Sequence, residues 1–522
     1  METFVSRHAG AVIGALTGFD RIVFRGTLRG LILRRFGMAR YLWAAKVPLK
    51  EFGAHAQQLS GQLKGASEAL AQRTCRPLRY LASSAANKEI IARKIAAADR
   101  IDVGLICILS AVEPCWSFQI VRYRDTKQLQ LEPRQRKCLH LYHYHIHPQL
   151  GFMHARIQTW FPFSIQVCFN GREWLARQMD AAGLAYIRRD NCFTWLEDAE
   201  RAQRLMDEQL KTTWPQLLHD IARGLNPLHE AMFCAYPIEY YWSIYQSEWA
   251  SDILFRDART LSRLYPKLVH HGLTTFLSPD VMRFLGRHIP PEGRVPPALK
   301  AEVVSDIKTR PEGVRIKHRL GGNSIKMYDK QGSVLRVETT INDAAGFKSF
   351  RAPEGKPDAD KSWYAMRKGI ADLHRRAEVS QAANKRYLDA LASIEDTRSL
   401  GELTARLCRP VKRNGRRVRP LNPYAPDDAS LLEAISRGEF ALNGFRNRDL
   451  RKLLFAEPAT ASDHHRQAAA VTRKLALLRA HRLIRKVPAT HRYILTPAGR
   501  TVITALISAR NASADSLVKL AA

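Results

Sequence analysis

Runs with the period of a strand alternate with runs of helical spacing along this chain. Strand-like runs occur in two blocks, at 22–24, 103–112, 117–123, 138–147 and 152–160, and again at 303–342. Runs of helical spacing occur at 47–73, 87–99, 172–182, 200–285 and 361–396. This mixture predicts a multidomain α+β protein with an antiparallel, β-rich body and a helical bundle segment.

The length of 522 residues corresponds to roughly three or four domains. We predict consecutive regions with these bounds: a basic α+β region at 1–102, a β-rich domain with a histidine-bearing hairpin at 103–200, a helical region at 201–300, a β-meander and helix at 301–400, an exposed basic linker at 401–427 and a C-terminal module at 428–522. The linker rests on 409–420, which has six Lys/Arg and no acidic residue. The sequence shows no internal repeat.

The net charge decides which partner we expect. Subtracting 49 Asp+Glu from 82 Lys+Arg gives +33, and the sequence pI is near 10.2. Repulsion among so many positive charges destabilises a compact fold unless a polyanion is the normal partner. Nucleic acid is therefore the leading candidate. Residues 21–50 alone hold eight Lys/Arg and no acid. Hydrophobic residues make up 46% of the chain, which excludes a wholly disordered protein.

Several protein classes are not expected from the sequence. No segment is long and apolar enough to cross a bilayer, and the N-terminus lacks the order of a secretory signal. The eight cysteines are scattered without a CxxC pair, which disfavours a zinc ribbon or a disulfide framework. The P-loop, HExxH, GxSxG and protein-kinase motifs are missing. We therefore expect a reduced, cytoplasmic protein with no membrane partner.

The segments after Asp428 follow one another as helix, helix, long helix, hairpin and helix. They are Ser430–Phe440, Arg446–Phe455, 462–483, the strands Ile484–Val487 and Tyr493–Leu495, and a last helix opened by Thr496–Arg500. This order, with the basic run Leu478–Lys486, resembles the recognition helix and wing of MarR-type winged helix-turn-helix regulators. The resemblance implies that a helix enters a DNA groove and the hairpin follows the backbone.

Basic side chains that we expect to contact nucleic acid lie mostly in this module. Residues 462–500 hold nine Lys/Arg against Asp463 alone. The expected contacts are Lys317, Lys326, Arg336, Arg413, Arg416, Arg466, Arg473, Lys474, Arg482, Arg485, Lys486 and Arg492. DNA is preferred to RNA as the partner. A winged helix that binds protein or RNA is the alternative.

A histidine-rich hairpin is predicted at 138–160. With a four-residue turn, His145 lies opposite His154, and one open face carries His143, His145, His154 and Arg156. Three imidazoles on one face fit a divalent metal or a phosphate. His145–His147 also resembles the His-hydrophobic-His motif of the HUH nicking enzymes, in which two histidines hold a metal and a tyrosine attacks DNA. A polar sheet face without a ligand is the alternative.

The strands of 314–342 separate polar from apolar faces. A three-residue loop at 331–333 pairs Tyr328 with Arg336 and Lys326 with Glu338. With a four-residue first turn, the polar face carries Arg315, Lys317, Lys326, Tyr328, Arg336 and Glu338, and the core face carries Ile316, Ile325, Met327, Leu335, Val337 and Ile341. One carboxylate among cations has a depressed pKa and stays ionised, as a metal ligand must.

The order Lys326–Lys330 followed by Arg336–Glu338 resembles a pairing in rolling-circle replication initiators of small plasmids. The resemblance implies that Glu338 is a metal ligand and Tyr328 a nucleophile. Asp20 and Glu113, at strand ends, could join Glu338 in an acidic cluster that binds Mg²⁺ or Mn²⁺, as in two-metal nucleases. The alternative is a basic nucleic-acid-binding platform in which Glu338 only holds its cationic neighbours.

The whole chain is similar to uncharacterised bacterial proteins that have a MarR-like tail and are associated with mobile elements. We expect a nucleic-acid-binding protein of a mobile element or plasmid. Its body would carry a metal-dependent nicking or strand-transfer site, as in a replication initiator or a transposase. The alternative is a non-catalytic winged-helix regulator or an RNA-binding protein.

Overall fold

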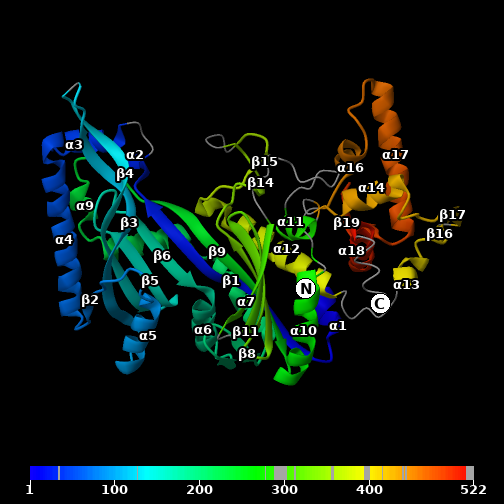
Figure 1. Ribbon diagram of the computed structural model, residues 1–522, viewed down its shortest axis with the longest axis horizontal. Coiled ribbons are helices and arrows are strands. Elements are labelled where there is room, and N and C mark those ends of the chain that lie inside the picture. The colour runs from blue at the N-terminus through cyan, green and yellow to red at the C-terminus, as the bar shows by residue number, and fades with distance from the viewer. Residues whose placement is uncertain are drawn as a thin grey trace.

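The computed structural model has the expected α+β fold, with one large sheet as its body and a C-terminal module beside it (Figure 1). The structure describes residues 1–32, 36–125, 127–274, 276, 278–286, 303–310, 313–353, 358–392, 400–413, 415–437, 440, 444–488 and 490–512. Across these ranges, every helix is too short or too polar to cross a bilayer.

Eleven strands form the sheet, in the order β10-β11-β12-β13-β9-β1-β6-β5-β4-β3-β2. Their bounds are β1 Val12–Thr27, β2 Leu78–Tyr80, β3 Gly104–Arg122, β4 Leu129–His147, β5 Gly151–Gln158, β6 Ile165–Asn170, β9 Tyr241–Phe255, β10 Val303–Arg310, β11 Gly313–Leu320, β12 Asn323–Lys330 and β13 Val334–Ile341. All neighbours pair antiparallel except β2 and β3. The antiparallel body is therefore confirmed.

The two halves of this sheet have the same connectivity. In the first half, β1 leads through helices to the meander β3-β4-β5-β6, and β6 returns to pair with β1. In the second half, β9 leads through helices to the meander β10-β11-β12-β13, and β13 returns to pair with β9. Because β1 and β9 pair antiparallel at the centre, an approximate two-fold axis between them relates the halves. The body thus contains a structural repeat that the sequence does not reveal.

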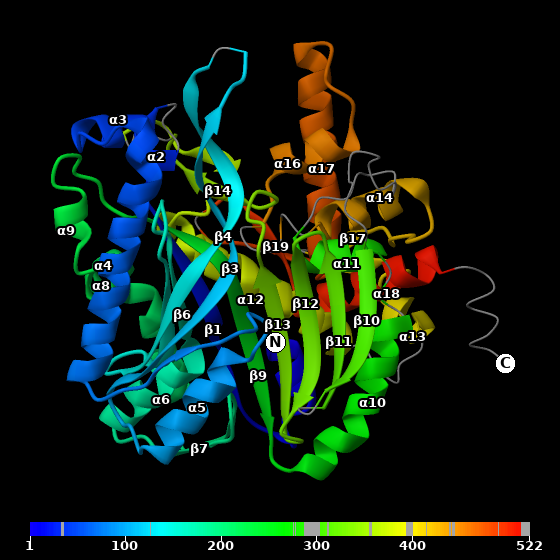
Figure 2. The same cartoon turned by 60° about the vertical axis from the view of Figure 1, so that its left-hand side comes forward.

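Helices cover the sheet on both faces (Figures 1 and 2). Those of the body are α1 Glu2–Arg7, α2 Arg29–Ile32, α3 Gly37–Ala44, η1 Leu49–Glu51, α4 Phe52–Arg73, α5 Lys88–Ala98, α6 Gly171–Ala181, α7 Ala199–Asp207, η2 Glu208–Lys211, α8 Trp214–Leu225, α9 His229–Met232, α10 Ala258–Thr274, α11 Ser278–Phe284, η3 Ile370–Asp372 and α12 Leu373–Leu391. One apolar core packs β1 and β4–β6 against α4, α6 and α8, and a second packs β9 and β11–β13 against α10–α12.

Short two-stranded sheets complete the body. They are β7 Tyr186–Arg188 with β8 Phe193–Leu196, and β14 Lys348–Arg351 with β15 Ser362–Ala365. The β7–β8 loop carries Asn191 to the centre of the large sheet, where it contacts β1. The β14–β15 hairpin follows directly after β13 in the chain.

The C-terminal module has the expected order of elements and its own core. It contains α13 Leu400–Ala405, β16 Val411–Arg413, β17 Arg416–Val418, α14 Pro426–Ile435, α16 Asn447–Leu454, α17 Ala461–Ala480, β18 Ile484–Lys486, β19 Tyr493–Leu495 and α18 Pro497–Asn511. Leu431, Val471 and Leu478 belong to that core. An ion pair of 3.0 Å between Arg500 and Asp389 joins α18 to α12 of the body.

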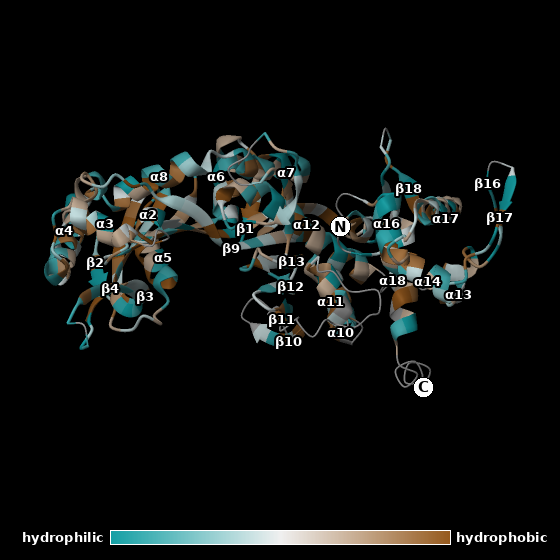
Figure 3. Ribbon diagram, turned by 90° about the horizontal axis from the view of Figure 1, so that it is seen from above, coloured by the Kyte–Doolittle hydropathy of each residue, from teal (hydrophilic) through white to brown (hydrophobic). Residues whose placement is uncertain are grey.

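The exposed basic linker predicted at 401–427 is in part a folded element of the C-terminal module. Part of it forms the β16–β17 hairpin, which projects from the module as a hydrophilic ribbon (Figure 3). Leu407 and Leu421 are buried in the core of the module, and Arg419 forms a 2.7 Å ion pair with Asp428. Charge and proline content made the segment look solvated, but its few leucines hold it against the helices.

The predicted helical region at 201–300 is also wrong in its centre, because β9 runs through it. β9 is one of the two central strands, and its second half, 249–255, is buried on both faces, so its apolar residues do not alternate cleanly with polar ones. It joins the strands of 103–200 and 301–400 into one sheet instead of two domains. The boundary predicted at residue 300 lies outside the described residues.

Candidate metal centre on the central strands

Three carboxylates from adjacent strands meet at the centre of the sheet. They belong to Asp20 on β1, Glu248 on β9 and Glu338 on β13, and one oxygen from each lies within 4.8 Å of the others. Asp20 and Glu338 are buried and Glu248 is half-buried. The structure therefore brings together Asp20 and Glu338, which the sequence singled out, with a glutamate that it did not.

A β-bulge places Asp20 in this cluster. Phe19 pairs with Trp249 and Arg21 pairs with Glu248, so Asp20 is the extra residue between two regular pairs. A bulge re-aims side chains within a strand and is common beside functional sites. The bulge explains why Asp20 lies beside Glu338, although the two residues are far apart in the chain.

The pairing predicted for the second meander is confirmed. Lys326 lies opposite Glu338, and Tyr328 lies opposite Arg336. The predicted core face is buried as well: Ile316, Ile325, Met327, Leu335, Val337 and Ile341. The first turn is tighter than expected, because pairing continues to Leu320 and Asn323, but the register is the same.

Glu338 makes two contacts with its neighbours on β12. The Lys326 ammonium lies 2.6 Å from Oε1, and the Tyr328 hydroxyl donates a hydrogen bond to Oε2. Burial raises the pKa of Glu338, but Lys326 outweighs it and holds the net pKa below its ordinary value. Burial, followed by the charge of Glu338, raises the pKa of Tyr328 well above its ordinary value. Glu338 is thus ionised and Tyr328 is protonated at neutral pH.

Glu248 behaves differently from Glu338. Burial, and then the repulsion of Glu338, raises its pKa to about 7. The Lys326 ammonium lies 3.5 Å from Glu248, farther than from Glu338, and so compensates it less. Near neutral pH, this carboxyl group is therefore poised between its protonated and ionised forms.

Two buried arginines hold the aspartates beside this pair. Arg336 donates to Asp252 through Nε at 2.5 Å and through Nη2 at 2.8 Å, and Arg172 donates through Nη2 at 2.9 Å. Arg336 also donates to Asp20 at 3.3 Å, and the Asn191 amide donates to both oxygens of Asp20 at 3.0 Å. Although burial opposes ionisation, the two guanidiniums lower the pKa of Asp252 to about 2.

The expected role of Arg336 in binding nucleic acid is therefore wrong. Its side chain is fully buried and donates hydrogen bonds to Asp252, Asp20 and the Asn191 carbonyl. Lys326 is nearly buried as well and is committed to the two glutamates. The polar face predicted for this meander exists, but at its centre it is an internal ion-pair network.

The charges of this network do not balance completely. Among the described ion pairs, the two guanidiniums balance the two aspartates, whereas Lys326 is shared by Glu248 and Glu338, and Arg21 attracts Glu248 from farther away. These direct ion pairs leave one negative charge over unless Glu248 is protonated. Carboxylate oxygens are the ligands that Mg²⁺ prefers, and Mn²⁺ also takes them. The residues present thus fit a divalent cation that would replace a proton.

The third predicted carboxylate, Glu113, is not part of the cluster. It lies on the outer strand β3, where it pairs with Lys88 at 3.1 Å and Arg156 at 3.0 Å and accepts a hydrogen bond from the Tyr142 hydroxyl at 2.7 Å. Glu248 takes its place. The aromatic and β-branched residues around Glu248 were the signal that could have marked a strand there.

Comparison with known proteins adds nothing to this geometry. No protein family, curated protein or solved structure matches this chain. The resemblances to MarR-type regulators, HUH enzymes and rolling-circle initiators therefore stay predictions.

The expected metal site of His143, His145 and His154 is wrong, because His154 lies on the opposite face of the sheet from His143 and His145. His145 pairs with Met153, and Tyr144 pairs with His154. The turn is one residue shorter than predicted, and such a shift moves a whole strand to the opposite face. Burial lowers the pKa of both His143 and His154 to about 3 and that of His145 to about 4, so all three are neutral.

The basic residues predicted in the C-terminal module lie mostly at its surface. Exposed ones are Arg416, Arg466, Arg473, Arg482, Arg485 and Lys486; half-buried ones are Arg413, Lys474 and Arg492. Lys317 of the meander is half-buried. This placement leaves the long helix and the wing of the module with a basic surface.

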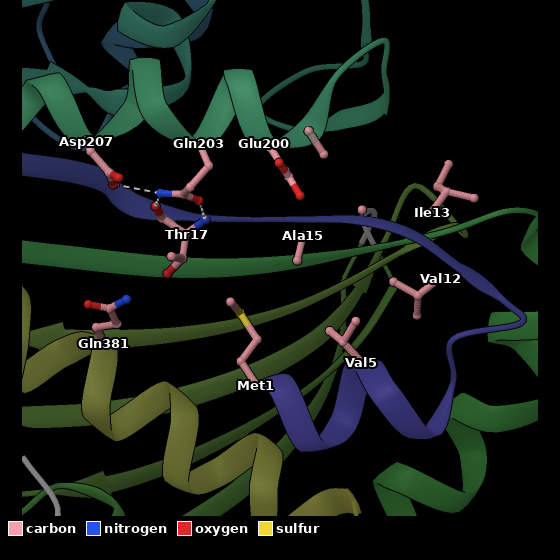
Figure 4. Close-up of a pocket in the computed structure, with 12 residues that line it drawn as sticks. Met1, Val5, Val12, Ile13, Ala15, Thr17, Glu200, Gln203, Asp207 and Gln381 are labelled. Atoms are coloured by element: carbon pink, nitrogen blue, oxygen red, sulfur yellow. Dashed lines mark hydrogen bonds between the residues drawn. The ribbon is translucent and has the colours of Figure 1, made fainter. Parts of the chain in front are cut away.

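A pocket of about 620 Å³ lies apart from the metal centre (Figure 4). It is bordered by α1, α7, α12 and the half of β1 that does not pair with β6. The Gln203 amide donates to the Thr17 carbonyl at 2.8 Å and accepts from its N–H at 2.7 Å, as a neighbouring strand would. None of the three clustered carboxylates lines this pocket.

Proposed function

We propose that this protein binds DNA and cleaves or transfers its phosphodiester bonds with the help of Mg²⁺ or Mn²⁺. The convergence of Asp20, Glu248 and Glu338 on three adjacent strands carries the proposal. The net charge of +33 supports a polyanionic substrate. The basic C-terminal module would hold the DNA, as expected of a mobile-element or plasmid protein such as a replication initiator or transposase.

The three carboxylates would hold the cation. A divalent ion there supplies Lewis-acid chemistry, which polarises a phosphodiester for attack. Asn191 and Arg336 fix the position of Asp20, so this ligand is preorganised by hydrogen bonds.

The nearest candidate nucleophile is Tyr328. Its hydroxyl oxygen would attack phosphorus and release its proton to solvent, and the hydrogen bond that the hydroxyl donates to Glu338 would orient it for this attack. The bond from phosphorus to the leaving nucleotide oxygen breaks, and that oxygen takes a proton from Lys326. The DNA end would remain on Tyr328 as a phosphotyrosyl ester. Attack by water at the same site would give simple hydrolysis instead.

One observation favours a second function without catalysis. Lys326 contacts both glutamates, so the network is largely compensated without a metal. In that case the body would be a scaffold, and the protein a winged-helix regulator or an RNA-binding protein.

Incubation with supercoiled plasmid and single-stranded circular DNA tests the proposal. With Mg²⁺ or Mn²⁺ we expect nicked or linear products, and with EDTA none. Tyr328→Phe should abolish cleavage and remove the covalent DNA–protein adduct on a denaturing gel if tyrosine is the nucleophile. Cleavage that persists in this variant without an adduct assigns the attack to water. A gel shift without cleavage in the presence of either metal would contradict the proposed enzyme and support the non-catalytic regulator.

The raised pKa of Glu248 predicts how metal binding depends on pH. Because a cation must displace the proton, Mn²⁺ affinity should rise about tenfold per pH unit up to about pH 7 and then level off. The stability of the metal-free protein should change with pH in the opposite direction. Because the raised pKa means that Glu248 takes up a proton on folding, the free energy of unfolding should fall as pH rises from about 4.5 to about 7. Calorimetric titration with Mn²⁺ measures the first effect. Glu248→Gln should bind more weakly and without this slope, and a flat wild-type profile contradicts the assignment.

A further inference from the structure

Two large aromatic rings lie side by side on the surface of the β14–β15 hairpin. Phe350 and Trp363 are a cross-strand pair whose ring centroids are 5.3 Å apart. Phe350 is 55% exposed and Trp363 is 42% exposed. Single exposed apolar residues are ordinary, but a paired aromatic surface that the described structure leaves open marks a site of interaction.

Cationic groups surround these rings. On their face of the hairpin, the Arg375 guanidinium lies 5.4 Å from the Trp363 ring, whereas Arg351 contacts Tyr364 on the opposite face. Lys348 and Lys361 are exposed and form no ion pair among the described residues. The nearby acids are partly used, since Asp372 bonds to Arg367 and Glu378 to Arg375, whereas Asp358 and Asp360 lie in the preceding loop.

The hairpin is anchored to the same strands that carry the metal centre. Ile341, at the end of β13, packs with Phe347 and Met366 at the base of the hairpin. The Ile244 N–H of β9 donates to the Lys368 carbonyl at 2.6 Å. Figures 1 and 2 both place β14 above the centre of the sheet, between the first meander and the C-terminal module. Glu338 lies three residues before Ile341 on β13, and at about 3.3 Å per residue roughly 10 Å of strand separates the two.

We propose that Phe350 and Trp363 form a stacking platform for an unpaired nucleobase, so that the substrate is single-stranded or locally melted nucleic acid. This inference rests on the proposed function and specifies its substrate. Every base has an aromatic face that can stack on these rings, while Lys348, Lys361 and Arg375 would attract the neighbouring phosphates. A duplex keeps its bases stacked on one another and offers no such face within its length.

Binding of labelled oligo(dT) of about 20 nucleotides, compared with a duplex of equal length, tests the platform. The measurement is fluorescence anisotropy in EDTA, so that no cleavage occurs. Phe350→Ala and Trp363→Ala should each weaken oligo(dT) binding roughly 5- to 150-fold and change duplex binding less than about twofold. The slope of log affinity against log salt should stay the same, because stacking releases no counterions. Lys348→Ala should lower that slope by about 0.7.

Matched variants separate stacking from a change in fold. Trp363→Phe keeps an aromatic face and should retain most of the affinity. Trp195→Ala removes a tryptophan of similar exposure, 40%, from β8 and should leave oligo(dT) binding unchanged. If the alanine variants lose affinity equally for single strands and duplex, or lose none for either, the stacking proposal is wrong. The exposed rings would then be a surface for a protein partner. Platform-dependent binding without metal-dependent cleavage would instead retain this inference and retire the proposed enzyme.

Discussion

Glu338→Gln is expected to reduce metal-dependent DNA cleavage by about a thousandfold or more. The amide keeps the shape of the side chain but removes a negative charge from the three-carboxylate set. A bound metal contributes several kcal/mol to a phosphoryl-transfer barrier, and each 1.4 kcal/mol is about a factor of ten in rate. Single-turnover cleavage with Mn²⁺ measures the loss. The rise in melting temperature on adding Mn²⁺ should disappear with it, which ties the effect to metal binding.

The first meander supplies a matched control for this substitution. Glu113 is a half-buried glutamate that, like Glu338, contacts a lysine and a tyrosine; it also pairs with an arginine, and it lies on an outer strand away from the cluster. Glu113→Gln should leave cleavage within about twofold of the wild type. If Glu338→Gln cleaves as well as Glu113→Gln, the carboxylate cluster is structural and not catalytic.

Asp252→Ala is expected to lower the free energy of unfolding by about 3–5 kcal/mol. Asp252 is the main partner of two fully buried guanidiniums, those of Arg172 and Arg336, and its removal leaves Asp20 as the one carboxylate that pairs with them among the described residues. Breaking one partner of a buried ion pair costs this much because a charge stays behind without compensation. Urea denaturation followed by circular dichroism measures the change.

An exposed ion pair provides the comparison for Asp252. Asp220 and Arg223 lie 3.5 Å apart on α8, with side chains 54% and 63% exposed. Asp220→Asn should change stability by less than about 0.5 kcal/mol. Acid should act on the wild type in the same direction as Asp252→Ala: because the pKa of Asp252 is about 2, below its ordinary 3.8, its stabilisation is complete above about pH 4 and is lost as pH falls through about 2. An equal, small effect of both substitutions would contradict a buried network.

The contrast between the two hairpins shows where face patterns were sufficient. In the second meander, only one loop length separates polar from apolar residues, and the pairing of Lys326 with Glu338 followed from that requirement alone. In the histidine hairpin, both faces are covered, so Tyr144 and Met153 on opposite faces are equally buried. Polarity then no longer distinguishes one register from the next, and the predicted face was wrong.

The same physics explains why Glu248 was missed while Asp20 and Glu338 were found. Asp20 and Glu338 lie beside short, clearly apolar or alternating runs, which the sequence identifies as strands. Glu248 lies on a central strand whose second half is buried on both faces and whose first half has aromatic residues at successive positions, so the sequence shows no strand period there. Its raised pKa also depends on a neighbour from another strand, which sequence cannot supply.

The sequence by itself determined the α+β class, the order of elements in the C-terminal module, the register of the second meander and the strong positive charge. These follow from local periodicity, turn length and composition, which need no knowledge of distant contacts. Only the tertiary structure decided that β9 joins the two meanders, that Glu248 completes the carboxylate cluster, and that Arg336 is internal. Strand pairing across hundreds of residues fixes those neighbours, because buried charges are compensated by whichever side chains the sheet brings beside them.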